Sequence, residues 1–283
     1  EGQPKLLLDA GDGRCLNWTD SVDAPNFTCL DEVLAAGLSL EEIRNLGQNV
    51  SHPQYVPWEE VRFSAPIWHP GKIICVGLNY REHVAEGRNE RIASDETPTL
   101  FVKTNNTLSW PTREIKVPRE FDHVDWEGEL AVVIGKSCGR LDQDSWPSAV
   151  LGYTVANDLS ERRLQRATSQ WYPGKSVNGF CPLGPWIRLH DGRFDPQNLE
   201  LTTTVNGAVM QHANTNQMIF PIGSLLTFIS SFCDLQPGDV LLTGTPSGVG
   251  VHRNPPIFLK SGDAVTVTIE GIGELTNTIA VVE

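Results

Sequence analysis

Three acidic residues stand where predicted strands begin and end. Glu127 and Glu129 are two apart in residues 125–134, which read as a strand, so both side chains point to one face. The run then becomes apolar, which places two like charges near an interior where they need compensation. Asp158 follows a second predicted strand, 151–156, and can add a third carboxylate. Three carboxylates suit a hard cation such as Mg²⁺, Mn²⁺ or Ca²⁺.

A simpler interpretation needs no metal. The two glutamates can lie on a solvated strand face, and Asp158 can cap the helix predicted to follow it. Spacing alone favours this ordinary alternative, so the neighbouring motifs must decide between a metal site and a solvated strand face.

A histidine and a glutamate lie three residues apart in the segment 77–86, GLNYREHVAE. If this segment is helical, His83 and Glu86 face each other. A carboxylate that holds one imidazole nitrogen leaves the other free to take a proton. The commoner alternative is a surface ion pair on a short helix.

Four further polar residues are candidates to bind an anionic substrate. Lys103 ends a predicted strand, and Lys175 lies in a tight turn; either can bind a carboxylate or neutralise charge, although a lone lysine is usually a solvated surface residue. Arg162 and Gln165 are three apart on the helix after Asp158 and can reach a ligand there, or face water.

The glycine-rich run 244–250, GTPSGVG, superficially resembles a phosphate-binding loop. It lacks the Gly-Lys-Ser/Thr ending, and no amphipathic helix follows, which excludes a nucleoside triphosphatase. Its backbone amides can instead face a carboxylate or oxo group, or the run is a plain turn.

The elements that position these residues predict a mainly β protein with short helices. Residues 1–68 are expected to form a small N-terminal α/β domain, with a strand near 5–10, two short helices within 28–46 and a Ser39–Glu42 capping box. Residues 69–283 are expected to form the catalytic domain, a curled or sandwiched β-fold. Its predicted strands are 73–76, 99–102, 130–134, 151–156, 201–205, 240–243 and 264–269, and its predicted helices are 159–169 and 222–232.

Composition limits the partners. The 283 residues carry a formal net charge of −13, which excludes a nucleic-acid partner but not an anionic substrate in a pocket with local cations. The six cysteines form no C-x-x-C pair, which favours buried thiols in a reducing compartment. We expect no signal peptide and no membrane span, and therefore a cytoplasmic location.

In combination, these segments resemble the fumarylacetoacetate hydrolase family from about Lys72 to the C-terminus. The segments that carry the resemblance are GLNYREHVAE (77–86), PTLFVK (98–103), DWEGELAVVIGK (125–136), GYTVANDLSERRLQ (152–165), GKSVNGFCPLGPW (174–186), LTTTVNG (201–207) and GDVLLTGTPSGVG (238–250). The resemblance implies a rolled β-sandwich catalytic domain and a homodimer.

The resemblance also implies roles for the first two motifs. Glu127, Glu129 and Asp158 match the metal carboxylates of the family, in which Mg²⁺ or Mn²⁺ is usual. His83 and Glu86 match a dyad on a lid that orders over the substrate.

For the other candidates, the resemblance implies positions around the same site. Lys175 matches a lysine beside the metal, and Arg162 and Gln165 match substrate contacts. Thr245 lies in the loop that contacts the substrate carboxylate, and Lys103 is the remaining substrate-binding candidate.

Two departures flank the expected site. The chain has Glu161-Arg162-Arg163 where similar sequences commonly have Ala-Arg-Asp, and Val177-Asn178-Gly179 where they often have Phe-Asp-Thr. The substrate can therefore differ from that of better-known members.

The resulting hypothesis is metal-dependent hydrolysis of a C–C bond in a 2,4-dioxo acid of the acylpyruvate type. His83, oriented by Glu86, would activate water, and the metal and Lys175 would stabilise the enolate that forms. Oxaloacetate decarboxylation and keto–enol isomerisation use the same residues and remain alternatives, as does an inert, metal-stabilised binding protein. The distal group of the substrate is expected to depend on residues 88–96 and on the N-terminal unit.

Overall fold

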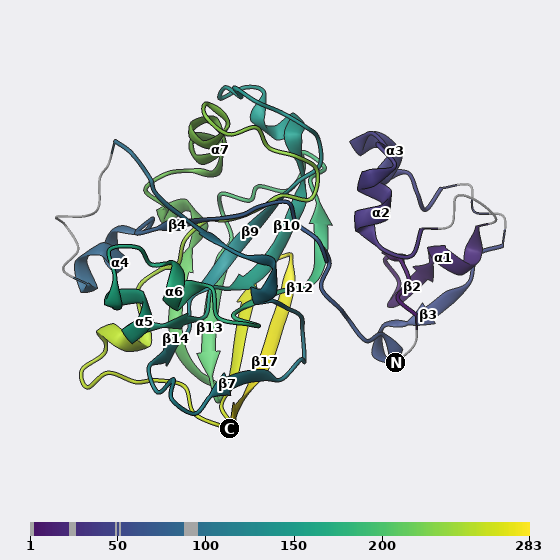
Figure 1. The fold of residues 1–283 in the computed structure, drawn as a ribbon. Helices are drawn as coiled ribbons and strands as arrows, with labels where there is room; N and C mark the ends of the chain where they lie inside the picture. The colour runs from purple at the N-terminus through teal and green to yellow at the C-terminus, as the bar shows by residue number, and fades with distance from the viewer. Residues whose placement is uncertain (1–2, 23–26, 49, 51, 88–95) are drawn as a thin grey trace.

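The computed structural model describes residues 3–22, 27–48, 50, 52–87 and 96–283 (Figure 1). The fold is mainly β with short helices, as the sequence predicted. Its strands are β1 Leu7–Asp9, β2 Arg14–Asn17, β3 Tyr55–Pro57, β4 Ile73–Gly77, β5 Thr99–Lys103, β6 Leu108–Ser109, β7 Ile115–Pro118, β8 Val124–Asp125, β9 Gly128–Ile134, β10 Val150–Asn157, β11 Ser160–Glu161, β12 Cys181–Leu189, β13 Glu200–Val205, β14 Ala208–Asn214, β15 Val240–Leu242, β16 Ala264–Ile269 and β17 Gly273–Val282. Each strand expected from the sequence is present.

Helices are short throughout the described part of the chain. They are α1 Trp18–Ser21, α2 Leu30–Ala35, α3 Leu40–Arg44, α4 Arg81–Glu86, α5 Arg162–Ala167, α6 Tyr172–Lys175 and α7 Ile222–Ser230. Within the described residues, none of these helices has the length and apolar character needed to cross a bilayer.

Two sheets pack face to face in the main body. One has the strand order β5-β4-β15-β9-β10-β12-β6 and the other β14-β13-β16-β17-β7. Leu130 and Val132 of β9 and Val155 of β10 meet Leu201 of β13 and Val267 of β16 in one buried cluster. This interdigitation of two inner faces defines a β-sandwich.

The central strand β9 is buried on both faces. Its even-numbered residues enter the cluster between the sheets, whereas Ala131 packs in a second cluster and Val133 in a third. A strand covered on both sides needs apolar residues at successive positions, which explains the continuous apolar run that follows Glu129.

The N-terminal unit contains the three-stranded sheet β1-β2-β3 and helices α1 to α3. The Ser39 capping box is confirmed: the Ser39 N–H donates to Glu42 at 2.7 Å, and the Glu42 N–H donates to Ser39 Oγ at 3.2 Å. Helices α2 and α3 pack through Val33 and Ile43 onto Val133 of the main body. The 1–68 boundary stays a prediction.

This contact lies away from the acidic residues. Val133 is near the end of β9 that is remote from Glu129, and in Figure 1 the N-terminal unit and helices α4, α5 and α6 lie on opposite sides of the main body. The expectation that the N-terminal unit helps to choose the distal group of the substrate therefore finds no support in a single chain. Residues 88–96 were also expected to determine the distal group of the substrate, and residues 88–95 of that segment lie outside the described residues.

The predicted strand 125–134 is interrupted, because side chains take two of its backbone donors. Asn157 Oδ1 accepts the N–H of Glu127 at 3.0 Å, and Gln211 Oε1 accepts that of Gly128 at 3.0 Å. The run therefore divides into β8, which pairs with β11, and β9, which pairs with β10 and β15.

The helix predicted from residue 159 begins later. Ser160 and Glu161 form the short strand β11, and the Glu161 carboxylate then caps α5 by accepting the N–H of Leu164 at 2.6 Å. The ordinary alternative, in which Asp158 caps this helix, is wrong, because Glu161 supplies the cap. Strands β2, β3, β6, β7, β12, β14 and β17 were also not expected; prolines and a glycine interrupt the apolar pattern of β12.

Candidate active site

The three predicted metal carboxylates converge at one end of β9 and β10. The strands are antiparallel, with Gly128 opposite Asn157, and the N–H of Asp158 donates to the C=O of Glu127 at 2.8 Å. One carboxylate oxygen from each of Glu127, Glu129 and Asp158 lies within 4.8 Å of the others. All three side chains are buried, so the ordinary alternative of a solvated strand face is excluded.

Two lysines enclose this cluster. Lys175 Nζ lies 2.6 Å from Glu127 Oε2 and 2.7 Å from Asp158 Oδ2, and Lys103 Nζ lies 2.5 Å from Asp158 Oδ1. Burial opposes the lysine charge, but Asp158 and Glu127 raise the pKa of Lys175. Both ammonium groups therefore hold carboxylates. Lys175 has three N–H donors, and its hydrogen bonds to described residues use two of them, which leaves one to offer a ligand.

Arg162 is also directed at protein groups. Its Nε donates to Asp125 Oδ2 at 2.9 Å, and its Nη1 lies 2.7 Å from Glu127 Oε1. Nη1 also donates to Gln165 Oε1 at 2.9 Å. The arginine thus fixes Glu127 in position.

Charge is unevenly compensated within the cluster. Burial alone would raise the pKa of Glu127, but Lys175 and Arg162 lower it to about 2. Burial and the neighbouring Asp158 and Glu127 carboxylates raise the pKa of Glu129 well above its usual value. Among the described residues Glu129 has no ion pair, and the N–H of Gly244 is its donor, at 2.6 Å. An uncompensated carboxylate beside two others is the arrangement that a divalent cation would neutralise, so these residues fit Mg²⁺ or Mn²⁺.

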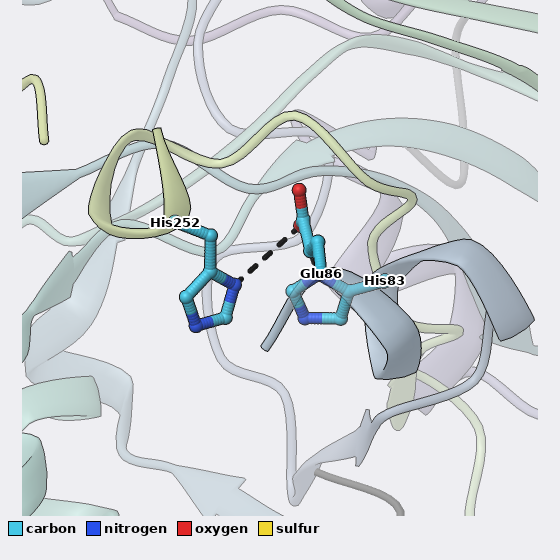
Figure 2. A group of neighbouring side chains, drawn as sticks. All are labelled: His83, Glu86 and His252. Atoms are coloured by element: carbon cyan, nitrogen blue, oxygen red, sulfur yellow. Dashed lines mark hydrogen bonds and ion pairs between the residues drawn. The ribbon is translucent and has the colours of Figure 1, made fainter. Parts of the chain in front are cut away.

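A second cluster brings helix α4 to the turn at Gly250–His252 (Figure 2). His83 Nδ1 lies 2.7 Å from Glu86 Oε1, as the i,i+3 spacing predicted, and His252 Nδ1 lies 3.6 Å from the same oxygen. Burial alone would raise the pKa of Glu86, but His252, His83 and the Gly248 N–H lower it to about 2. The His83 ring also helps to lower the pKa of Glu127, which links the two clusters.

The glycine-rich loop joins the clusters through its backbone. The N–H of Gly244 donates to Glu129, that of Gly248 to Glu86 Oε2 at 2.9 Å, and that of Gly250 to Asp125 Oδ1 at 2.7 Å. The amides do face carboxylates, but these are carboxylates of the protein. The loop therefore acts as a common support for the site.

Thr245 faces the protein as well. Its hydroxyl donates to the C=O of Gly128 at 2.9 Å and accepts from Gln211 Nε2 at 2.8 Å. Both bonds are buried, so Thr245 fixes the loop against the start of β9.

Three residues of the site were missed from the sequence. Asp125 accepts from Arg162 and from loop amides, and it could have been found as the first acid of the Asp125-Trp126-Glu127-Gly128-Glu129 alternation. Gln211 and His252 are isolated polar residues with no local signal, and only the tertiary structure brings them to the site.

Comparison with known proteins identifies the family. The model for the C-terminal domain of fumarylacetoacetate (FAA) hydrolase matches residues 72–280. Human oxaloacetate tautomerase FAHD2B, mitochondrial, is 43% identical over 278 residues, which cover 98% of this chain and 87% of that protein.

Two solved structures are similar over nearly the whole chain. The 5-carboxymethyl-2-hydroxymuconate delta-isomerase from Mycobacterium smegmatis is 36% identical, with a TM-score of 0.75 over 99% of this chain and 94% of that one. The fumarylacetoacetate hydrolase from Exiguobacterium antarcticum is 32% identical, with a TM-score of 0.84 over 98% of this chain and 95% of that one.

This chain belongs to the fumarylacetoacetate hydrolase family and is an enzyme of that family. The family and the extent of the match, both expected from the sequence, are confirmed. The relatives named above include a tautomerase, an isomerase and a hydrolase, so membership alone leaves the reaction to be proposed.

Proposed function

We propose that this enzyme is a divalent-cation-dependent keto–enol tautomerase that acts on a small 2-oxo dicarboxylate of the oxaloacetate type. The observation that carries the proposal is the 43% identity, over 98% of the chain, to a protein named as an oxaloacetate tautomerase. The isomerase among the structural relatives supports the same class of reaction. This replaces C–C bond hydrolysis, which the sequence favoured, as the leading hypothesis.

The site provides what a tautomerase needs. Converting an enol to its keto form breaks one O–H bond and forms one C–H bond, and it consumes no water. With Glu86 ionised and holding His83 Nδ1–H, the other nitrogen, Nε2, can accept or return that proton. Lys175 can direct its third N–H at the oxygen on which negative charge develops.

Glu127, Glu129 and Asp158 would hold the cation, and Lys103 and Arg162 keep two of these carboxylates in place. When bound, Mg²⁺ or Mn²⁺ would act as a Lewis acid that polarises the oxo and carboxylate oxygens of the substrate. Gln165 is the candidate for a direct substrate contact through its amide nitrogen. Thr245 instead fixes the glycine-rich loop to Gly128 and Gln211.

The test follows the ultraviolet absorbance of freshly dissolved enol-oxaloacetate with and without enzyme, in Mg²⁺ and in excess chelator. We expect fast loss of the enol signal without release of pyruvate, and a decrease of about 10²–10⁴-fold in His83→Gln. His212→Gln is the matched control, because His212 is an exposed histidine on β14. Full activity of His83→Gln, or full activity in chelator, would contradict the proposal.

Hydrolysis remains the second candidate, favoured by the similarity to the Exiguobacterium hydrolase. Parallel assays separate the reactions: pyruvate from oxaloacetate indicates decarboxylation, and pyruvate with a second acid from an acylpyruvate indicates hydrolysis. A turnover number for either that exceeds enol conversion would replace the tautomerase assignment.

Two expectations stay predictions. The homodimer implied by the family resemblance can be tested by light scattering of the purified protein. We expected a cytoplasmic location, whereas the name of the human relative places that protein in mitochondria. Localisation of the tagged full-length protein in cells decides between the two.

A further inference from the structure

His252 forms a cluster with His83 and Glu86 that the proposed reaction does not need. His252 comes from the turn after the glycine-rich loop, whereas the other two residues are on α4, and the three side chains converge in Figure 2. Its Nδ1 lies 3.6 Å from Glu86 Oε1, which is too far for a hydrogen bond. This nitrogen is buried, and no hydrogen-bond partner for it is found in the described part of the chain.

The arrangement of donor atoms fits a tetrahedral metal. One donor atom from each residue lies within 4.8 Å of the others. Bonds of 2.0–2.2 Å at tetrahedral angles separate two ligand atoms by roughly 3.4 Å. The separations of 2.7 Å and 3.6 Å from the two histidines to Glu86 Oε1 bracket that value, so a small adjustment would admit an ion.

We propose that His83, Glu86 and His252 form a second metal site, which takes Zn²⁺ or a similar transition-metal ion rather than Mg²⁺. Two imidazole nitrogens and one carboxylate oxygen are ligands that zinc prefers, whereas Mg²⁺ prefers oxygen alone. The donor sets therefore separate the two sites: oxygen ligands at Glu127, Glu129 and Asp158, and nitrogen-rich ligands here.

The surroundings favour an ion at this position. Glu86 Oε2 is fixed by the N–H of Gly248 at 2.9 Å, which is the kind of outer hydrogen bond that orients a carboxylate ligand. The Glu86 and His252 side chains are 21% and 16% exposed, so an ion can enter from solvent. Three protein ligands leave one tetrahedral position for water or substrate.

Occupation of this site would have a consequence for turnover. A bound ion would take His83 Nδ1 and displace the proton shared with Glu86, and that proton would be released to solvent. Zinc should then inhibit the enzyme even when Mg²⁺ is saturating. This consequence rests on the proposed function, but the binding of zinc does not.

The experiment titrates Zn²⁺ into the full-length enzyme saturated with Mg²⁺, using calorimetry or a competing zinc indicator. We expect one Zn²⁺ per chain, weakened at least tenfold in His252→Leu and in His252→Gln, and unchanged in the control His212→Leu. Two His252 variants guard against a folding defect, and their thermal unfolding is compared with that of the wild type. Co²⁺ bound in the same way should give the visible absorption of a tetrahedral site.

A second variant distinguishes the two sites. Glu129→Gln should impair the carboxylate cluster and leave Zn²⁺ affinity at the histidine cluster unchanged. Equal Zn²⁺ affinity in the wild type and both His252 variants would overturn the proposal, as would binding that is lost only in Glu129→Gln, or no binding at micromolar Zn²⁺. Zinc binding that depends on His252 in an enzyme without tautomerase activity would refute the proposed function but keep this site.

Discussion

The two halves of the site are built differently. Glu129, Asp158 and Lys175 are at most 2% exposed, and they extend from β9, the end of β10 and α6 into the buried interior of the main body. His83 and Glu86 lie on a six-residue helix, with side chains 9% and 21% exposed. The carboxylate half is fixed by tertiary structure, whereas the histidine half is fixed by one turn of helix and one loop.

Because of this difference, we expect substitutions in the two halves to affect stability and activity differently. Buried charges that compensate one another leave an unpaired charge in the interior when one of them is removed. The partly exposed histidine half can be rehydrated by solvent, so its loss should affect chemistry more than stability. Three substitutions test this contrast.

Lys175→Met should have the largest effect on stability. It leaves Glu127 and Asp158 without the ammonium group that both contact, and loss of one partner of a buried pair costs about 3–5 kcal/mol. Urea unfolding in chelator measures the loss, and added Mg²⁺ should recover part of it. Lys136→Met, at an exposed lysine, is the control and should change stability by less than about 0.5 kcal/mol. A decrease of less than about 1 kcal/mol in the free energy of unfolding of Lys175→Met would contradict the proposed difference between the two halves.

Gly250→Ala should have an intermediate effect on both halves, because the loop supports both. A Cβ at this position would lie 2.0 Å from the Ile257 carbonyl oxygen and 2.7 Å from Asp125 Oδ1. The backbone must shift, at a cost of about 1–3 kcal/mol, and turnover should fall with it. The control Gly47→Ala meets nothing closer than 3.5 Å. Unchanged stability and turnover in Gly250→Ala would show that the loop does not couple the halves.

Glu86→Gln should have the smallest effect on stability, about 1–2 kcal/mol, because Glu86 is partly exposed and solvent screens part of its interactions. The folded state lowers the pKa of Glu86 from an ordinary value near 4.5 to about 2, so between these values the folded state binds fewer protons than the unfolded state. The wild type therefore exceeds Glu86→Gln in free energy of unfolding by the full amount above about pH 4.5, and this difference shrinks as the pH falls towards 2. Thermal unfolding of both proteins between pH 7 and 3.5 measures it, with Glu82→Gln as a control on the same helix. A difference that grows on acidification would contradict the assignment.

The same contrast explains what the sequence could predict. Alternation in one strand predicted Glu127 and Glu129, and helical spacing predicted the His83–Glu86 pair, because both signals are local. The partners of Lys103 and Arg162 are set by contacts between distant segments, so these residues were expected to face a substrate and instead hold Asp158, Asp125 and Glu127.

The boundaries of the strands also depend on contacts between distant segments, which local sequence signals cannot predict. The break at Trp126–Glu127 depends on Asn157 and Gln211, two side chains from other strands that take backbone donors. Periodicity within one segment carries no information about such contacts. The family resemblance supplied the metal ligands that we expect, but it could not indicate His252.

The glycine-rich loop holds Glu129, Glu86 and Asp125 through peptide N–H groups rather than side chains. Any residue except proline can offer such a donor, although Gly244 and Gly248 are further restricted by positive φ, and Gly250 by the close approach of the Ile257 carbonyl oxygen. Ser247 is partly exposed and can therefore vary without changing the support of these acidic groups, whereas Val249 is buried and restricted by packing. A one-residue insertion or deletion would misalign all of the donors together. In this loop, length and backbone path constrain the enzyme more than the identity of an exposed side chain such as Ser247, which leaves that position open to change as substrates diverge.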